Sequence, residues 1–121
     1  MHRSMMQIYV KNSNKAVPFY QNAFDAKLLC DHRNENGTLA HAELDIFGQV
    51  LAICETLENE VITGNSMQFC LHFGEEKEAV VNKIVEKLSD GGTFTYHGAT
   101  DWSPLMAGII DKFGVNWCIF V

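Results

Sequence analysis

The residues with the clearest chemical potential in this sequence are His41 and Glu43, which stand two positions apart. An imidazole titrates near neutral pH and a neighbouring carboxylate can orient it, so the pair suits acid–base chemistry or contact with a ligand. The alternative interpretation is structural, with His41 hydrogen-bonded to Glu43 inside a filled sheet. No nucleophile on a recognisable strand-to-helix elbow accompanies the pair, and covalent catalysis is therefore not indicated.

Alternation predicts that residues 38–46 form the strand that carries this pair. Polar and apolar side chains alternate there, so one face would be polar and the other would lie beneath a helix. The polar set is His41, Glu43 and Asp45, and the apolar set is Ala42, Leu44 and Ile46. Phe47-Gly48 predicts a hairpin to a second strand at 49–55, because glycine tolerates positive φ. A turn of two or four residues pairs odd positions of the first strand with even positions of the second.

The chain also contains an internal repeat, which predicts its architecture. Asp45-Ile46-Phe47-Gly48 before one apolar strand corresponds to Asp111-Lys112-Phe113-Gly114 before another, and Met6-Gln7-Ile8-Tyr9-Val10 matches Met67-Gln68-Phe69-Cys70-Leu71. We therefore predict one α+β domain over residues 1–121, built from two βαβββ modules at about 5–57 and 65–121. The modules would form a curved, half-barrel-like mixed sheet with helices on the outer face.

Each module is predicted with the same order of elements. The first has strands at 5–11 and 26–33 around a helix from about Asn14 to Ala23, with Pro18 expected in the first turn because it has no N–H to donate. The second has strands at 66–73, 93–99, 105–111 and 115–121. Its helix runs from Glu75 to Ser89 and ends at Gly91-Gly92. One stripe of that helix is apolar, with Val81, Ile84, Val85 and Leu88.

Composition and charge exclude several classes of function. The 121 residues carry nine Lys+Arg against fifteen Asp+Glu, a formal charge of −6, and the lysines are scattered, so nucleic acid is not an expected partner. No window approaches the ~20 apolar residues of a membrane span, and no signal peptide is apparent. The four cysteines are widely spaced without a CxxC pair, which is not zinc-ligand spacing; they are Cys30, Cys54, Cys70 and Cys118. A reducing, cytoplasmic location is expected.

Phe19-Tyr20 ends the predicted early helix, and D-x-F-G precedes the predicted last strand. With the predicted order of elements, these features resemble the vicinal-oxygen-chelate superfamily of glyoxalases, extradiol dioxygenases and bleomycin-resistance proteins. Three longer segments are Ala16-Val17-Pro18-Phe19-Tyr20 with Ala23-Phe24, then His41-Ala42-Glu43-Leu44, then Asp111-Lys112-Phe113-Gly114-Val115-Asn116-Trp117. Within the superfamily, they are similar to the PhnB-like branch, often labelled 3-demethylubiquinone methyltransferase-like. The resemblance covers nearly the whole chain. Methyl transfer is not expected, because the chain has no GxGxxG and is too short for a doubly wound nucleotide-binding domain.

The resemblance also implies where a metal would bind. Members with metal chemistry place His and Glu ligands on the first and last strands of each module, and here those positions fall on Met5, Ala52, Ser66 and Cys118. These side chains do not make a site for a hard divalent ion, so we expect no metal and no cofactor there. The inference depends on strand register, because a slip of one residue reverses every side-chain direction.

With this register, the alternation of side chains along each strand predicts which residues share a binding face. The predicted ligand-binding residues are Gln7, Tyr9, His41, Glu43, Gln68, Cys70, Cys118 and Phe120. A mixed polar and aromatic lining is typical of a small-molecule pocket. The remaining histidines are expected at the surface, namely His2, His32, His72 and His97. Trp117 is expected in the core or an interface, with Ile110 across the hairpin.

These observations predict a small-molecule-binding protein without the family's metal centre. The alternative is a metal-dependent lyase or dioxygenase that uses His41 and Glu43, and the sequence leaves open the ligand and whether a reaction is catalysed. A homodimer is also expected, because sheet edges are normally covered and the resemblance points to pairing. The apolar last strand, Trp117–Val121, would otherwise end exposed.

Overall fold

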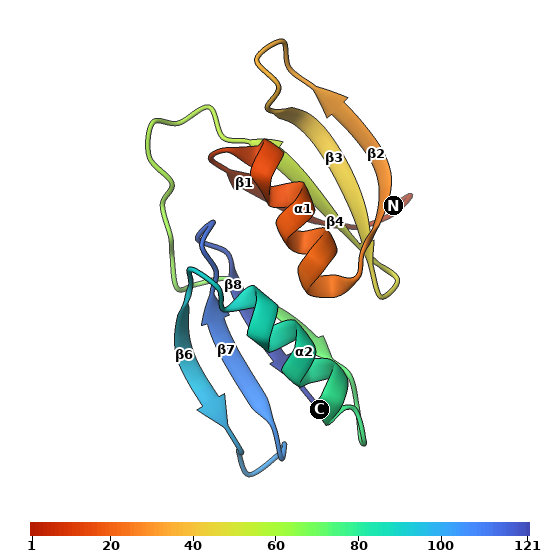
Figure 1. The fold of residues 1–121 in the computed structure, drawn as a ribbon, viewed down its shortest axis with the longest axis vertical. Coiled ribbons are helices and arrows are strands. Elements are labelled where there is room, and N and C mark those ends of the chain that lie inside the picture. Colours follow the sequence, from red (N-terminus) through yellow and green to blue (C-terminus); the bar gives the residue numbers. More distant parts are fainter. The chain divides into compact units, whose positions relative to one another are not determined.

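A computed structural model describes all residues, 1–121, as two compact units, Met1–Val61 and Ile62–Val121. We call them the first and the second module (Figure 1). The first contains β1 (Met6–Val10), α1 (Ser13–Phe24), β2 (Lys27–Arg33), β3 (Leu39–Ile46) and β4 (Gln49–Glu55). The second contains β5 (Phe69–His72), α2 (Glu78–Leu88), β6 (Thr93–Gly98), β7 (Met106–Ile110) and β8 (Asn116–Phe120). The predicted α+β class and the two βαβββ modules are confirmed.

Each module forms its own four-stranded mixed sheet. The strand orders are β1-β4-β3-β2 and β5-β8-β7-β6. In each sheet the first strand is parallel to the last, and the other pairs are antiparallel. The last strand of each module, β4 or β8, is therefore an inner strand, whereas β1, β2, β5 and β6 are sheet edges.

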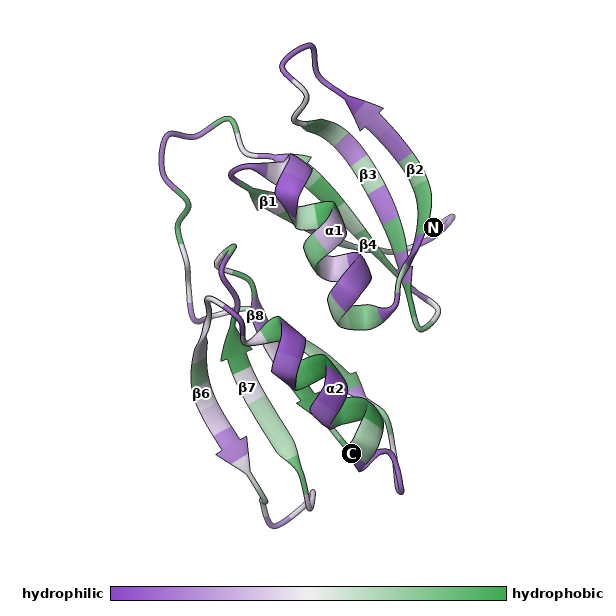
Figure 2. Ribbon diagram, in the orientation of Figure 1, coloured by the Kyte–Doolittle hydropathy of each residue, from purple (hydrophilic) through white to green (hydrophobic).

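One face of each sheet is covered by the helix of its own module (Figure 1). The predicted stripe of α2 is confirmed, because Val81, Ile84, Val85 and Leu88 are its buried residues. Apolar alternation on β3 is confirmed too, since Ala42, Leu44 and Ile46 are fully buried. Figure 2 shows this alternation of hydrophilic and hydrophobic residues along β3. We call the opposite side of each sheet, away from its helix, the open face of that module.

Pro18 lies inside α1 rather than in its first turn, so that prediction was wrong. Pro18 is exposed, and so is Asn14, whose carbonyl loses its N–H partner. The start of α1 is held by Glu55 at the end of β4, whose carboxylate accepts hydrogen bonds from the N–H groups of Asn12 and Ser13 at 3.2 and 2.9 Å. The carboxylate of a residue that is distant in sequence thus caps the helix.

Two boundaries of the second module also differ from the prediction. Helix α2 begins at Glu78 rather than Glu75, because Glu76 has a left-handed backbone with φ of 63°. Strand β5 begins at Phe69, so Ser66 and Gln68 precede it. Both differences shorten an element at its start.

The repeated D-x-F-G segment forms a hairpin turn in each module, with different lengths. Phe47 and Gly48 form a two-residue turn with φ of 56° and 89°, and Ile46 pairs with Gln49. In the second module Asp111 N–H donates to Val115 O, which leaves a three-residue turn. That extra residue shifts the partner of Trp117 to Ile109 rather than the predicted Ile110. Trp117 is fully buried in the core, as predicted.

Candidate functional site

Glu43 is the centre of a hydrogen-bonded group on the open face of the first module. The guanidinium of Arg3 donates two hydrogen bonds to its carboxylate, at 3.1 and 2.7 Å. His41 Nε2 lies 3.1 Å from Glu43 Oε1. The Glu43 side chain is only 9% exposed, whereas those of Arg3 and His41 are 50% and 32% exposed. A buried carboxylate is thus held by two partners that solvent reaches.

These contacts determine the ionisation of Glu43. The Arg3 guanidinium, followed by the hydrogen bond from His41, lowers the pKa of Glu43 from its ordinary 4.5 to about 2. The carboxylate is therefore ionised at neutral pH and acts as a hydrogen-bond acceptor or a ligand rather than as an acid.

His41 and Glu43 are two residues apart on β3, so their side chains lie side by side on one face of the sheet. The predicted hairpin register is confirmed. Glu43 pairs with Ala52 and Asp45 with Val50, so the odd positions of β3 face the same way as the even positions of β4. Cys54 Sγ lies 3.7 Å from His41 Nδ1, on the side of the imidazole away from Glu43. Burial raises the pKa of the Cys54 thiol, so this group is not an activated nucleophile.

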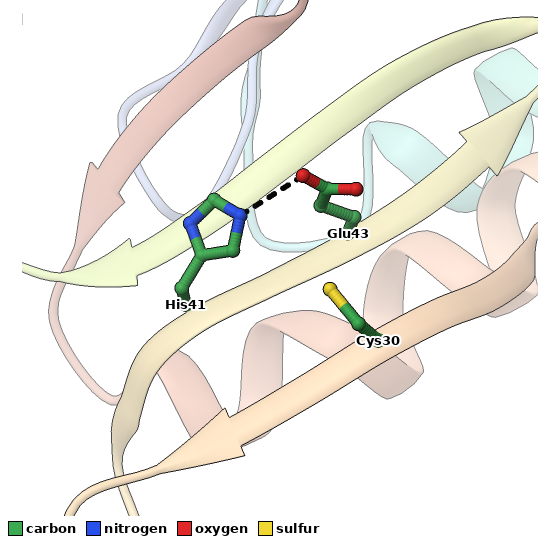
Figure 3. A group of neighbouring side chains, drawn as sticks. All are labelled: Cys30, His41 and Glu43. Carbon is green, nitrogen blue, oxygen red and sulfur yellow. Dashed lines mark hydrogen bonds and ion pairs between the residues drawn. The ribbon is translucent and has the colours of Figure 1, made fainter.

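A bulge in β2 adds a third side chain, Cys30. Leu28 pairs with Leu44 and Cys30 pairs with Glu43, so Leu29 is an extra residue. Without that residue Cys30 would oppose Ala42 and face α1. The bulge instead turns its thiol to the open face, where one ligand atom from each of Cys30, His41 and Glu43 lies within 4.8 Å of the others (Figure 3).

The other predicted residues of the first module lie on the same open face. Gln7 and Tyr9 are exposed, whereas Ile8 and Val10 between and beyond them are buried, as parity predicted. Gln7 Nε2 donates to the Tyr9 hydroxyl at 2.8 Å. Tyr9 is 58% exposed, which leaves a large part of its ring accessible.

The predicted residues of the second module lie on β5, on β8 and just before β5. Cys70 and Cys118 are partners on the parallel strands β5 and β8. Burial, followed by the Cys70 thiol, raises the pKa of Cys118 to about 11. Phe120 stacks on His72 with ring centroids 4.5 Å apart, and it forms a T-shaped pair with Trp102 at a centroid distance of 5.1 Å. Gln68 precedes β5 and donates to Asn116 Oδ1 at 3.1 Å.

The pairing of the strands revises the repeat between the two modules. Gln7 pairs with Ala52, and Cys70 pairs with Cys118 at the same place in the second sheet. The counterpart of Met5 is therefore Gln68 rather than Ser66, so the alignment of the two Met-Gln pairs was wrong by two residues. A slip of two preserves the face. The expected direction of Gln68 and Cys70 is unaffected, and Cys70 is exposed.

The second module has no counterpart of the Cys30, His41 and Glu43 group. It has the same bulge in β6, where Thr95 is the extra residue and Tyr96 pairs with Gly108. Tyr96 and Gly108 thus take the places of Cys30 and Glu43, and Met106 takes that of His41. The group of a thiol, an imidazole and a carboxylate therefore occurs only in the first module.

Sequence reasoning missed Arg3 and Cys30. Arg3 continues the odd positions of β1, so extending strand parity upstream would have found it. Cys30 gave no signal, because a bulge interrupts alternation. The four other histidines are exposed, as predicted, although His72 and His97 stack on Phe120 and Phe94.

Comparison with known proteins identifies the fold through solved structures. No family model matches the chain, and no curated protein matches it by sequence. Among solved structures, it is similar to a PhnB protein from Bacillus cereus, with 20% identity, 98% of each chain covered and a TM-score of 0.82. It is also similar to protein PA1353 from Pseudomonas aeruginosa, with 18% identity, 99% and 97% coverage and a TM-score of 0.82.

A third similar structure is the fosfomycin resistance protein FosX from Listeria monocytogenes, with 16% identity, 98% and 88% coverage and a TM-score of 0.72. The chain therefore has the fold of the glyoxalase/bleomycin-resistance, or vicinal-oxygen-chelate, proteins, as the resemblance predicted. At these identities the likeness establishes the fold alone. Neither helix has the length and apolarity that crossing a membrane requires.

Proposed function

We propose that the chain is a small-molecule-binding protein of the PhnB-like type that does not use the family's metal positions. The observation that carries this proposal is the Arg3, His41 and Glu43 group, which shares with the exposed ring of Tyr9 the sheet face that α1 does not cover. A few hydrogen-bonded polar groups next to aromatic surface are the usual composition of a ligand site. The proposed contacts are Gln7, Tyr9, His41, Glu43, Gln68, Cys70, Cys118 and Phe120.

Independence from metal at the family's positions is supported by the side chains there. Met5, Ala52 and Cys118 offer a thioether, a methyl group and a thiol whose pKa is raised to about 11. Gln68, the counterpart of Met5, has its amide engaged with Asn116. These groups do not make a site for a hard divalent ion.

A metal-dependent lyase or dioxygenase that uses His41 and Glu43 is the second candidate. It is favoured by the proximity of Cys30, His41 and Glu43. FosX, one of the similar structures, has been solved with Mn(II) and sulfate. The Cys54 and Cys118 thiols, both with raised pKa, offer no support for covalent catalysis.

Binding can be tested by NMR with a library of small anionic and aromatic compounds that includes fosfomycin. A hit should shift the ring signals of His41 more than those of His2, which lies outside every strand. Glu43→Gln should weaken that hit, while Asp31→Asn, an exposed carboxylate paired with Arg33, should not. Hits that shift only His2, or that bind Glu43→Gln unchanged, would contradict the proposed site.

We also propose a cytoplasmic homodimer that binds neither nucleic acid nor membrane. Four free cysteines fit a reducing compartment, and a charge of −6 disfavours nucleic acid. The edge strand β2 exposes Leu28 and Leu29, at 38% and 46%, which supports pairing of copies.

A further inference from the structure

We propose that Cys30, His41 and Glu43 form a site for a borderline-soft divalent cation, best represented by Zn²⁺, and that the cation exchanges with the Arg3 guanidinium. The site lies wholly within the first module and differs from the positions Met5, Ala52, Ser66 and Cys118 implied by the family resemblance. The inference does not depend on the proposed small-molecule binding, because it is tested with the metal alone.

The types of the three donor atoms and the distances between them suit a zinc ion. A thiolate, an imidazole and a carboxylate are the three donor types that Zn²⁺ takes in proteins. Donors bound at zinc distances lie roughly 3.3–3.8 Å apart in a tetrahedron. His41 Nε2 and Glu43 Oε1 are already 3.1 Å apart, and all three ligand atoms lie within 4.8 Å. Side-chain rotations that move the donor atoms by about 1 Å would bring all three to these separations.

Two neighbouring strands, β2 and β3, hold the three donor residues in place. Cys30 and Glu43 are direct partners on neighbouring strands, and His41 is two residues along β3 on the same face. The sheet therefore fixes the separation of their Cβ atoms before any metal binds. Only the bulge at Leu29 brings Cys30 into this register. His41 would bind through Nε2, with Nδ1 facing the Cys54 sulfur as an outer contact at 3.7 Å.

Arg3 is the group that a divalent cation would displace from Glu43. It is a cation that already neutralises Glu43, through two hydrogen bonds. Its side chain is 50% exposed and it lies outside β1, so it can leave without disturbing the sheet. A divalent ion and a guanidinium compete for one carboxylate. Three protein ligands would leave a fourth position for water or a ligand, as in open zinc sites.

The experiment is a Co²⁺ titration of the tag-free, reduced full-length chain after chelator treatment, because Co²⁺ replaces Zn²⁺ and gives visible bands. We expect one equivalent to produce tetrahedral d–d bands and a thiolate-to-cobalt charge-transfer band, both abolished by one equivalent of Zn²⁺. Cys30→Ser should remove the charge-transfer band, and Glu43→Gln should weaken Co²⁺ binding at least roughly ten-fold. Cys118→Ser, at a family position, should change neither.

The exchange with Arg3 has its own readout. Arg3→Gln removes the competing cation and should tighten Co²⁺ binding by up to about five-fold, the worth of a partly exposed ion pair. Weaker binding in Arg3→Gln would overturn the competition. A charge-transfer band that survives Cys30→Ser, or that is lost in Cys54→Ser instead, would overturn the ligand set. Its loss in Cys118→Ser would overturn both this site and the proposed independence from the family's metal positions. Absence of bands in a protein with an unchanged circular dichroism spectrum would overturn the site alone.

Discussion

Glu43 is the central residue of the candidate site, because three different side chains lie around its buried carboxylate. Arg3 comes from the segment before β1, His41 from the same strand, and Cys30 from the neighbouring strand. A carboxylate that is 9% exposed requires such partners, since an unpaired buried charge is costly. The same partners determine what the site can bind.

The first prediction concerns pH. The pKa of Glu43 is held at about 2, below its ordinary 4.5, so the folded state favours the ionised form. Its contribution to the free energy of unfolding is full above about pH 4.5 and is lost as the pH falls towards 2. In chelator-containing buffer, urea unfolding at stepped pH should show a shallower acid loss of stability in Glu43→Gln than in the parent.

Asp31→Asn is the matched control, because Asp31 also pairs with an arginine but at an exposed position. Its acid profile should follow that of the parent. Equal slopes for the parent and Glu43→Gln would mean that the Arg3 contact does not form in solution.

Turns and bulges decide, at the scale of elements, which residues share a face. The D-x-F-G turns look equivalent in sequence, yet they differ by one residue in length. Asp45 is half-buried, and its carboxylate accepts one hydrogen bond, from Gly48 N–H at 2.7 Å. Asp111 is buried and accepts three, from the N–H groups of Phe113 and Val115 and from Trp117 Nε1.

We therefore expect Asp111→Ala to lower the free energy of unfolding by about 2–3 kcal/mol, because it leaves the buried indole N–H of Trp117 without its acceptor. Asp45→Ala should cost under about 1 kcal/mol, since water can replace the carboxylate there. Denaturant unfolding of both variants measures the difference. Equal losses would indicate that the contacts of Asp111 do not determine the stability of its turn.

The bulge in β6 gives a third prediction. A Cβ at Gly108 would lie 2.4 Å from Thr95 Oγ1, closer than atoms approach. Gly108→Ala should destabilise the protein by about 1–3 kcal/mol through overpacking, and Thr95→Ala in the same chain should recover most of the loss. Gly64→Ala, which meets nothing within 4 Å, is the control. A double variant no more stable than Gly108→Ala would exclude Thr95 as the cause.

At the scale of the whole molecule, the last strand is not exposed in a monomer, contrary to the prediction. The last strand is buried in a single copy of the chain, with Trp117 and Ile119 at 0% and Val121 at 6% exposure. It lies between β5 and β7, so no second copy is needed to cover it. The case for pairing rests instead on sheet edges such as β2.

Light scattering at micromolar concentration should give twice the 13.6 kDa of one chain. A standard interface would bury ~800 Å² per subunit. Leu29→Lys places a charge at the exposed bulge of β2 and should shift the mass towards one chain if this edge is the interface. A mass of one chain for the parent at every concentration would exclude the homodimer.

The sequence by itself determined the features that follow from local periodicity. Alternation fixed the faces of Ala42 and Glu43, the helical stripe fixed the buried side of α2, and Phe47-Gly48 fixed the hairpin register. Each depends on residues within a few positions of one another, where the pleat or the helix pitch leaves few alternatives.

Only the tertiary structure decided the composition of the site. The contact between Arg3 and Glu43 joins residues 40 positions apart, which no local pattern records. Cys30 reaches Glu43 because one extra residue, Leu29, reverses the direction of the side chains that follow it. The start of β5 moved the counterpart of Met5 to Gln68 for a similar reason, since pairing with β8 rather than sequence likeness sets the register. Strand pairing is a long-range choice, and it is made only when the sheet assembles.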